Sequence, residues 1–190
     1  MVRRFRTREK WKPRGSEEGR AGGVGRLALH DGRQTTLCEA LETLIDGFPQ
    51  PDEALCAALG ERLAPHLRRY HRVEETFFFP ALERRLPASA ALRASLRRLE
   101  GEHREDHDAA SELSSELLSL SERRTREDFE SIAYHARALF RNVRRHVAGE
   151  ADFILPLAGQ VLNRDEMAFI ERAYERLERE AASPIHPLIR

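Results

Sequence analysis

The sequence predicts an all-α fold in which the helices pack as a bundle around one core. Leucine, alanine, glutamate and arginine dominate its 190 residues, whereas valine, isoleucine and threonine are few. After residue 25, glycine and proline are sparse, and apolar residues recur every three to four positions in four long stretches. The chain is long enough to bury the core of a single domain, and its 41% hydrophobic residues can fill that core.

The segment before the first helix is basic, and we predict that residues 1–25 form a flexible tail. Residues 1–26 hold nine arginines or lysines against three glutamates, so this end carries a charge of +6 and the rest of the chain −6. Almost no periodic apolar positions occur there, and such a segment cannot recover the entropy lost on ordering. We do not expect it to bind nucleic acid.

Two long helices are predicted in the first half of the chain, over residues 27–46 and 52–85. A glycine and a proline end the first of them. Pro65 and Pro80 interrupt the second helix and should kink it, because proline lacks the N–H that a helix interior needs.

Capping residues mark the remaining helices. Ser89 can cap the start of a third helix, and Thr125 together with Asp128 can cap a fourth. A short terminal helix is predicted over residues 164–182, with its start at Asn163.

Histidines and glutamates interrupt the apolar seams of these helices at positions where leucine is expected. Residues four apart project from one face of a helix, about 6 Å apart along its axis, so a pair at this spacing can bind one ion. Three helices carry such a pair, and the first helix carries a single histidine. The candidate metal ligands are His30, His71, Glu75, His103, His107, His146 and Glu150.

These residues predict a metal centre because their burial would otherwise be costly. Unpaired buried charges are strongly destabilising, and cations supply the missing partner. Seven nitrogen and oxygen ligands exceed the four of a structural zinc site, and carboxylates that bridge suit two ions about 3.5 to 4 Å apart. Iron, manganese and zinc all accept imidazole with carboxylate. His66 lies beside the seam without a partner carboxylate, so we do not expect it to be a ligand.

Two stretches of the chain, with a histidine between them, resemble the hemerythrin-like family of HHE cation-binding domains. They are HRVEETFFFPAL, which starts at His71, and HVAGEADFILPL, which starts at His146. In each, a histidine and a glutamate are followed by apolar residues and a proline. The pair Glu102-His103 lies between the two stretches, and the likeness spans about residues 27–162.

The resemblance implies an up-down-up-down four-helix bundle, which we assign to residues 26–162. From the sequence pattern alone, residues 163–190 are expected to form an additional C-terminal helix and tail. It also implies a non-haem di-iron centre linked by an oxo or hydroxo group. Glu75 and Glu150 would bridge the two iron ions, and the five histidines would be terminal ligands. Zinc or manganese are the alternative metals.

The chain departs from the family pattern in the spacing before the two prolines. Pro80 follows His71 by nine residues, whereas Pro156 follows His146 by ten. This difference keeps Glu74 as an alternative to Glu75. In addition, Glu150 follows its histidine by four residues, where the oxygen-carrying hemerythrins have an aspartate at five.

The di-iron centre leads to three hypotheses of function. The first is a protein that binds or senses O₂, NO or peroxide. The second is a di-iron oxidoreductase that decomposes peroxide or NO, or that oxidises an organic substrate, with Tyr70, Tyr134 and Glu74 as candidate proton donors. The third is iron storage or donation. Whether the protein is an enzyme, and which electron donor or protein partner it uses, are left open.

The remaining features predict a protein of the bacterial cytoplasm. Cys38 and Cys56 are too few for a disulfide framework and are typical of reduced core thiols. No apolar run approaches the roughly 18 to 20 residues that span a bilayer, and no signal-peptide stretch is present, so we expect no membrane association. Nearly all cationic residues are arginine, which indicates a GC-rich genome.

Overall fold

The computed structural model describes residues 17–120 and 125–180, and for residues 17–31, 178 and 180 it describes the backbone alone. This part of the chain is helical apart from short turns and contains no strand. The predicted all-α fold is therefore confirmed. None of the helices in these ranges has the length and apolar character needed to cross a membrane.

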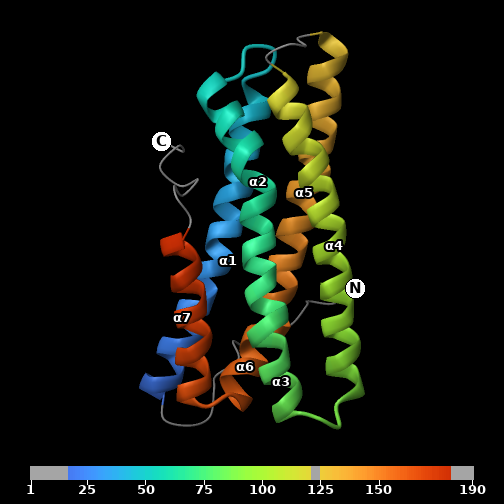
Figure 1. The fold of residues 1–190 in the computed structure, drawn as a ribbon. Helices are drawn as coiled ribbons and strands as arrows, with labels where there is room; N and C mark the ends of the chain where they lie inside the picture. Colours follow the sequence, from blue (N-terminus) through green and yellow to red (C-terminus); the bar gives the residue numbers. More distant parts are fainter. Residues whose placement is uncertain (1–16, 121–124, 181–190) are drawn as a thin grey trace, which may run out of the picture.

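Four long helical stretches lie side by side and form a helical bundle (Figure 1). Within it, α2 packs against α4, α4 against α5, and α5 against α1. The stretches are α1 (Glu17–Asp46); α2 (Glu53–Val73) with η1 (Glu74–Phe78) and α3 (Phe79–Arg85); α4 (Ala90–Ser119); and α5 (Arg126–Gly149) with η2 (Glu150–Ile154) and α6 (Leu155–Val161). A further helix, α7 (Arg164–Glu180), packs against α1 and α2.

Side-chain caps start three of these helices at the predicted positions. Ser89 Oγ accepts a hydrogen bond from the first turn of α4, and Thr125 and Asp128 form a capping box at the start of α5. Asn163 Oδ1 accepts the N–H of Glu166 at 2.9 Å, which caps α7. Three of the predicted helix starts are thus confirmed.

The first helix begins earlier than its apolar pattern predicts. α1 starts at Glu17, ten residues before the predicted start at residue 27, so residues 17–25 of the predicted tail are helical in this structure. Glycines and charges in this stretch give no apolar period from which a helix could be predicted. Residues 1–16 lie outside the described residues.

Two π-helical turns, η1 and η2, each precede a proline. In an α-helix, the ring of a proline clashes with the carbonyl four residues back, and a wider turn relieves that clash. The N–H groups just before Pro80 and Pro156 accordingly bond five residues back, to the carbonyl oxygens of Glu74 and Glu150. Both π-turns therefore begin at a glutamate. By contrast, α2 continues through Pro65 as one helix.

The apolar core consists of two clusters with a polar layer between them. Along α4, Leu99 belongs to one cluster and Ala110 to the other, and the buried side chains of His103 and Asp106 lie between these positions. On the α5 stretch, buried His146 and Glu150 likewise lie between Val143 of one cluster and Ile154 of the other. On α2, buried His71 lies where the second cluster begins, next to Tyr70. The bundle therefore positions its polar groups at one level along its axis.

Candidate metal centre

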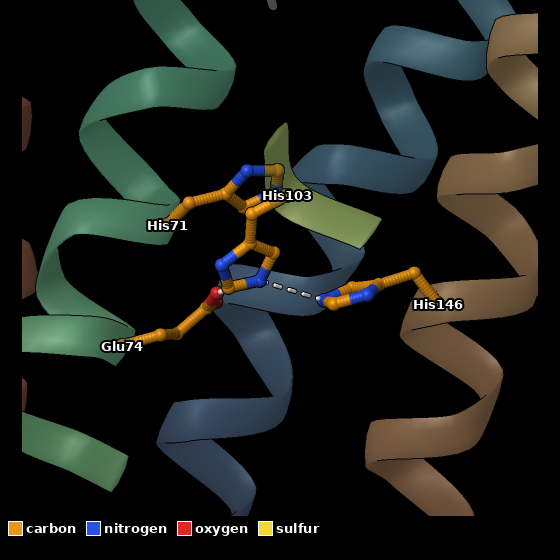
Figure 2. Close-up of side chains that lie close together, drawn as sticks. All are labelled: His71, Glu74, His103 and His146. Carbon is orange, nitrogen blue, oxygen red and sulfur yellow. Dashed lines mark hydrogen bonds and ion pairs between the residues drawn. The ribbon is translucent and has the colours of Figure 1, made fainter. Parts of the chain in front are cut away.

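Four buried side chains from three helical stretches converge in the polar layer (Figure 2). His71 lies near the end of α2, and Glu74 follows one turn later at the start of η1. His103 comes from the middle of α4, and His146 from the last turn of α5. Their ligand atoms all lie within 4.8 Å of one another.

The facing atoms have the spacing of ligands around a metal ion. His103 Nε2 lies 3.2 Å from His146 Nε2 and 3.2 Å from Glu74 Oε2. Glu150 Oε1 lies 3.7 Å from His146 Nε2. Metal–ligand bonds of about 2.0 to 2.2 Å place two ligands of one ion roughly 3 to 3.5 Å apart. These separations match that geometry closely enough for one ion to contact several of the atoms.

Each of the three histidines is held through its other ring nitrogen. His103 Nδ1 lies 2.6 Å from Glu75 Oε1, and His146 Nδ1 lies 3.1 Å from Glu102 Oε2. A carboxylate accepts from an Nδ1–H, which leaves Nε2 as the lone-pair nitrogen that can bind a metal. Two of the imidazoles are thus oriented with that nitrogen toward the cluster.

His71 is oriented in a similar way, by another histidine. Its Nδ1 lies 3.0 Å from His107 Nε2, and its ring stacks on that of His103 with a centroid separation of 3.8 Å. His71 Nε2 is buried and has no hydrogen-bond partner among the described residues. An imidazole nitrogen without a partner is costly to bury unless something binds it.

The electrostatics keep the cluster in forms that can bind a metal. Burial, together with the charge on His103, holds the pKa of His71 well below its ordinary value, and burial also lowers that of His146. Burial raises the pKa of Glu74, but the hydrogen bond from His103 and the histidine charges outweigh it and set the pKa at about 2. Glu74 is therefore a carboxylate, and His71 and His146 are neutral near pH 7.

His103 differs from the other two histidines in its charge. Burial lowers its pKa, but the adjacent carboxylates of Glu74 and Glu75 outweigh burial and raise it. Without a metal, a proton on His103 is the positive charge available to these two carboxylates. A cation bound at Nε2 would take the place of that proton.

The structure places the seven predicted ligands at different distances from the cluster. His71, His103 and His146 are in it, and buried Glu150 lies beside it. Glu75, whose side chain is 39% exposed, and half-buried His107 reach the cluster histidines from outside. His30 lies in α1, but its side chain is outside the described residues.

Glu74, the alternative to Glu75, is the glutamate that enters the cluster. It precedes Pro80 by six residues, and Glu150 precedes Pro156 by the same number. Counting back from the prolines therefore identifies Glu74. Counting forward from His71 by a four-residue step identifies Glu75, because that count assumes an uninterrupted α-helix.

Asp106 and Gln34 are further buried polar residues of the bundle that were not among the predicted ligands. Asp106 Oδ2, and both amide atoms of Gln34 on α1, are buried without hydrogen-bond partners among the described residues. Burial raises the pKa of Asp106 to about 7, which the charge of His103 partly counteracts. Asp106 follows His103 by three residues, a spacing that places both on one face of α4 and could have drawn attention to it.

The donor set fits a metal. Three closely packed imidazoles face two carboxylates, and all of these residues are 2% exposed or less. One imidazole nitrogen, His71 Nε2, has no hydrogen-bond partner among the described residues. A bound cation would offset the cost of burying two carboxylates and several imidazole lone pairs together. The protein is thus a helical bundle with a buried histidine–carboxylate site suited to a metal cation.

The comparisons with known proteins agree with this description. The family model described as the hemerythrin HHE cation binding domain matches residues 23–158, so the chain belongs to that family. The resemblance seen in the sequence is thereby confirmed. No match was found among curated proteins or among solved structures.

Proposed function

We propose that this chain is a non-haem di-iron protein that binds or senses O₂, NO or peroxide. The observation that supports it best is the set of three imidazoles with Nε2 turned inward beside two buried carboxylates, Glu74 and Glu150. Two ferrous ions there would supply two electrons and an open coordination position to a small ligand. The proposal includes the up-down-up-down order of the four long stretches.

In this proposal the residues of the site divide into two groups. His71, His103 and His146 hold the metal through Nε2, joined by His30 from α1, and the iron ions share the carboxylates of Glu74 and Glu150. The second group is formed by Glu75, Glu102 and His107, which hold the Nδ1 atoms and so fix the orientation of the ligands.

Burial favours a small ligand over an organic substrate. The four cluster residues are 2% exposed or less, and apolar clusters close the bundle on both sides of their layer. Diatomic molecules and peroxide are small enough to diffuse through the fluctuations of a packed core. A larger substrate would need an opening to the cluster.

The proposal is tested by metal analysis followed by spectroscopy. We expect two iron ions per chain, and, after anaerobic reduction, a visible absorption that forms with O₂ and disappears when O₂ is removed. The test variant is Glu74→Ala, which should abolish the two-iron stoichiometry. The matched control is Glu83→Ala, at an exposed glutamate on α3, which should leave the stoichiometry unchanged. Purified protein that takes up no iron would overturn the proposal, and iron that exchanges rapidly with a chelator would favour storage or donation.

A buried acid favours a di-iron oxidoreductase as the second candidate. Peroxide reduction consumes protons as well as electrons, and Asp106, with its pKa raised to about 7 by burial, can supply a proton near neutral pH. Of the proton donors suggested by sequence, Tyr134 is 71% exposed, whereas Asp106 shares the polar layer with His103.

We expect Asp106→Asn to slow peroxide consumption at least tenfold with an unchanged iron content, because the general acid is lost while the ligands are retained. Asp108→Asn, at an exposed position on the same helix, is the control. Wild-type protein that consumes no peroxide in the presence of a reductant would rule out peroxide reduction as this second function.

A further inference from the structure

Helix α7 reaches the candidate metal centre although it lies beyond the residues that match the family. The match ends at residue 158, and α7 begins at Arg164. From its middle, the hydroxyl of Tyr174 donates a hydrogen bond of 3.2 Å to Glu74 Oε1, and both side chains are buried. The residues that match the family model therefore do not include every residue in contact with the cluster.

The two oxygens of Glu74 have different partners. Oε1 accepts from Tyr174, whereas Oε2 lies 3.2 Å from His103 Nε2 and faces the cluster. A hydrogen bond to one oxygen restricts rotation of the carboxylate group, so the other oxygen cannot turn away from the cluster. Tyr174 thus determines which oxygen of Glu74 is presented to the site.

Tyr174 is itself held in place by its surroundings. Its ring lies 5.9 Å from that of Tyr70 on α2, between centroids, and Arg33 on α1 lies 3.4 Å from the Tyr70 hydroxyl. Met167 and Ile170 bury the same face of α7 in the second apolar cluster. Such packing positions the hydroxyl and reduces the entropy that the hydrogen bond must overcome.

We propose that Tyr174 is a positioning residue of the metal centre, through which α7 holds Glu74 with Oε2 directed at the metal. The proposal rests on the function proposed above. Outer partners that hold a ligand typically contribute ten- to a hundredfold to metal affinity, because a ligand without them must be ordered when the metal binds. α7 is thus a part of the site and not only a cover for the bundle.

The test compares Tyr174→Phe with Tyr134→Phe, an exposed tyrosine on α5. Phenylalanine keeps the ring and removes only the hydroxyl. Co²⁺ is titrated into the metal-free full-length protein in competition with a chelator, and its visible spectrum is recorded together with urea unfolding of the metal-free forms. We expect Tyr174→Phe to weaken Co²⁺ binding ten- to a hundredfold and to alter the Co²⁺ spectrum, and Tyr134→Phe to change neither.

A double variant shows whether the effect passes through Glu74. In the Glu74→Gln background, Tyr174→Phe should cause little further loss of Co²⁺ affinity, because the ligand it positions is already gone. A Tyr174→Phe variant with lowered stability but wild-type Co²⁺ affinity and spectrum would overturn the positioning role. Failure of the wild-type protein to bind any metal would instead overturn the proposed function on which this role rests.

Discussion

Each histidine of the candidate metal centre uses its two ring nitrogens for different purposes. The Nδ1 atoms of His103 and His146 contact Glu75 and Glu102, while their Nε2 atoms face one another across 3.2 Å. Two lone pairs at that separation repel each other unless a proton or a cation lies between them. The orientation of these side chains is therefore explained by a positive charge at the centre of the cluster.

The first prediction separates Glu74 from Glu75. Glu74→Ala should prevent binding of two metal ions per chain, because it removes a buried oxygen of the cluster. Glu75→Ala should retain the stoichiometry and weaken binding about ten- to a hundredfold, because it removes only the partner of His103 Nδ1. Metal content and chelator competition measure both effects. If Glu75→Ala empties the site while Glu74→Ala still binds two ions, the roles are reversed.

The second prediction concerns His66, which lies outside the cluster. Burial, together with the charges of Arg69 and Arg33, lowers its pKa to about 4. In the unfolded chain a histidine titrates near 6.5, so below that pH the unfolded state binds a proton that the folded state excludes. The contribution of His66 to stability is therefore complete above pH 6.5 and is lost as the pH falls toward 4.

Urea unfolding of metal-free wild-type protein and His66→Gln at pH 7 and pH 5 measures this effect. The free energy of unfolding should fall less for His66→Gln than for the wild type, by about 1 kcal/mol after allowance for partial exposure to water. Metal content should be the same in both proteins. An equal loss of stability in the two proteins would show that His66 is protonated in the folded state.

At the residue scale, sequence patterns locate the site but do not distinguish the residues that face the metal from those that orient them. The apolar seams place His71, His103 and His146 inside because an apolar residue lies three or four positions before each of them, and all three are buried. The choice between Glu74 and Glu75 depends on the local helix type. Counting residues along the apolar seam assumes an α-helix, whereas the turn that begins at Glu74 is a π-helix. Tyr174 has only an apolar pattern around it, which predicts burial but not a partner on another helix.

At the scale of helices, the two prolines determine where the carboxylates lie. The π-turns before Pro80 and Pro156 each insert an extra residue at a glutamate, which shifts the register of everything that follows. Such turns are costly in an otherwise regular helix and often occur at functional sites. The repeated Glu–π-turn–Pro arrangement on two stretches is therefore a device for presenting two carboxylates to one layer.

The third prediction is that Pro80→Ala disturbs the site without destabilising the fold. Alanine restores the missing N–H and removes the ring clash, so η1 can become a regular α-turn and Glu74 moves. Metal affinity should fall at least tenfold, while the melting temperature of the metal-free protein stays the same or rises. Calorimetry and chelator competition test this directly.

Pro65→Ala is the matched control because α2 passes through Pro65 without a π-turn. It should raise stability and leave metal affinity unchanged. Equal metal affinities in the two proline variants would mean that the π-turn at Glu74 does not depend on Pro80.

Helix ends could be predicted where a capping side chain, a glycine or a proline marks them. Ser89, Thr125 and Asn163 cap α4, α5 and α7 as their residue types indicate. The start of α1 at Glu17 has no such pattern. The π-turns also have no propensity signal of their own, and only the comparison of the two proline spacings hints at them.

At the scale of the whole molecule, the polar layer makes the metal-free protein less stable than its helices and core would allow. It separates two apolar clusters and contains buried polar atoms that have no hydrogen-bond partners among the described residues. Well-packed hydrophobic residues in place of such buried charged groups often stabilise a protein by about 1 to 4 kcal/mol. Function and metal-free stability therefore oppose one another in this core.

The last prediction follows from this opposition. A metal that binds only the folded state stabilises it by about 2.7 kcal/mol at a concentration one hundred times its dissociation constant. For a protein of this size, that corresponds to a rise in melting temperature of roughly 5 to 10 °C. The double variant Glu74→Leu with His103→Leu should melt above the metal-free wild type, because it removes a buried charged pair, and should not respond to metal. Calorimetry with Fe²⁺ under anaerobic conditions, with and without chelator, measures the melting temperatures of both proteins. If Fe²⁺ raises the melting temperature of the double variant as much as that of the wild type, the ions bind outside the polar layer.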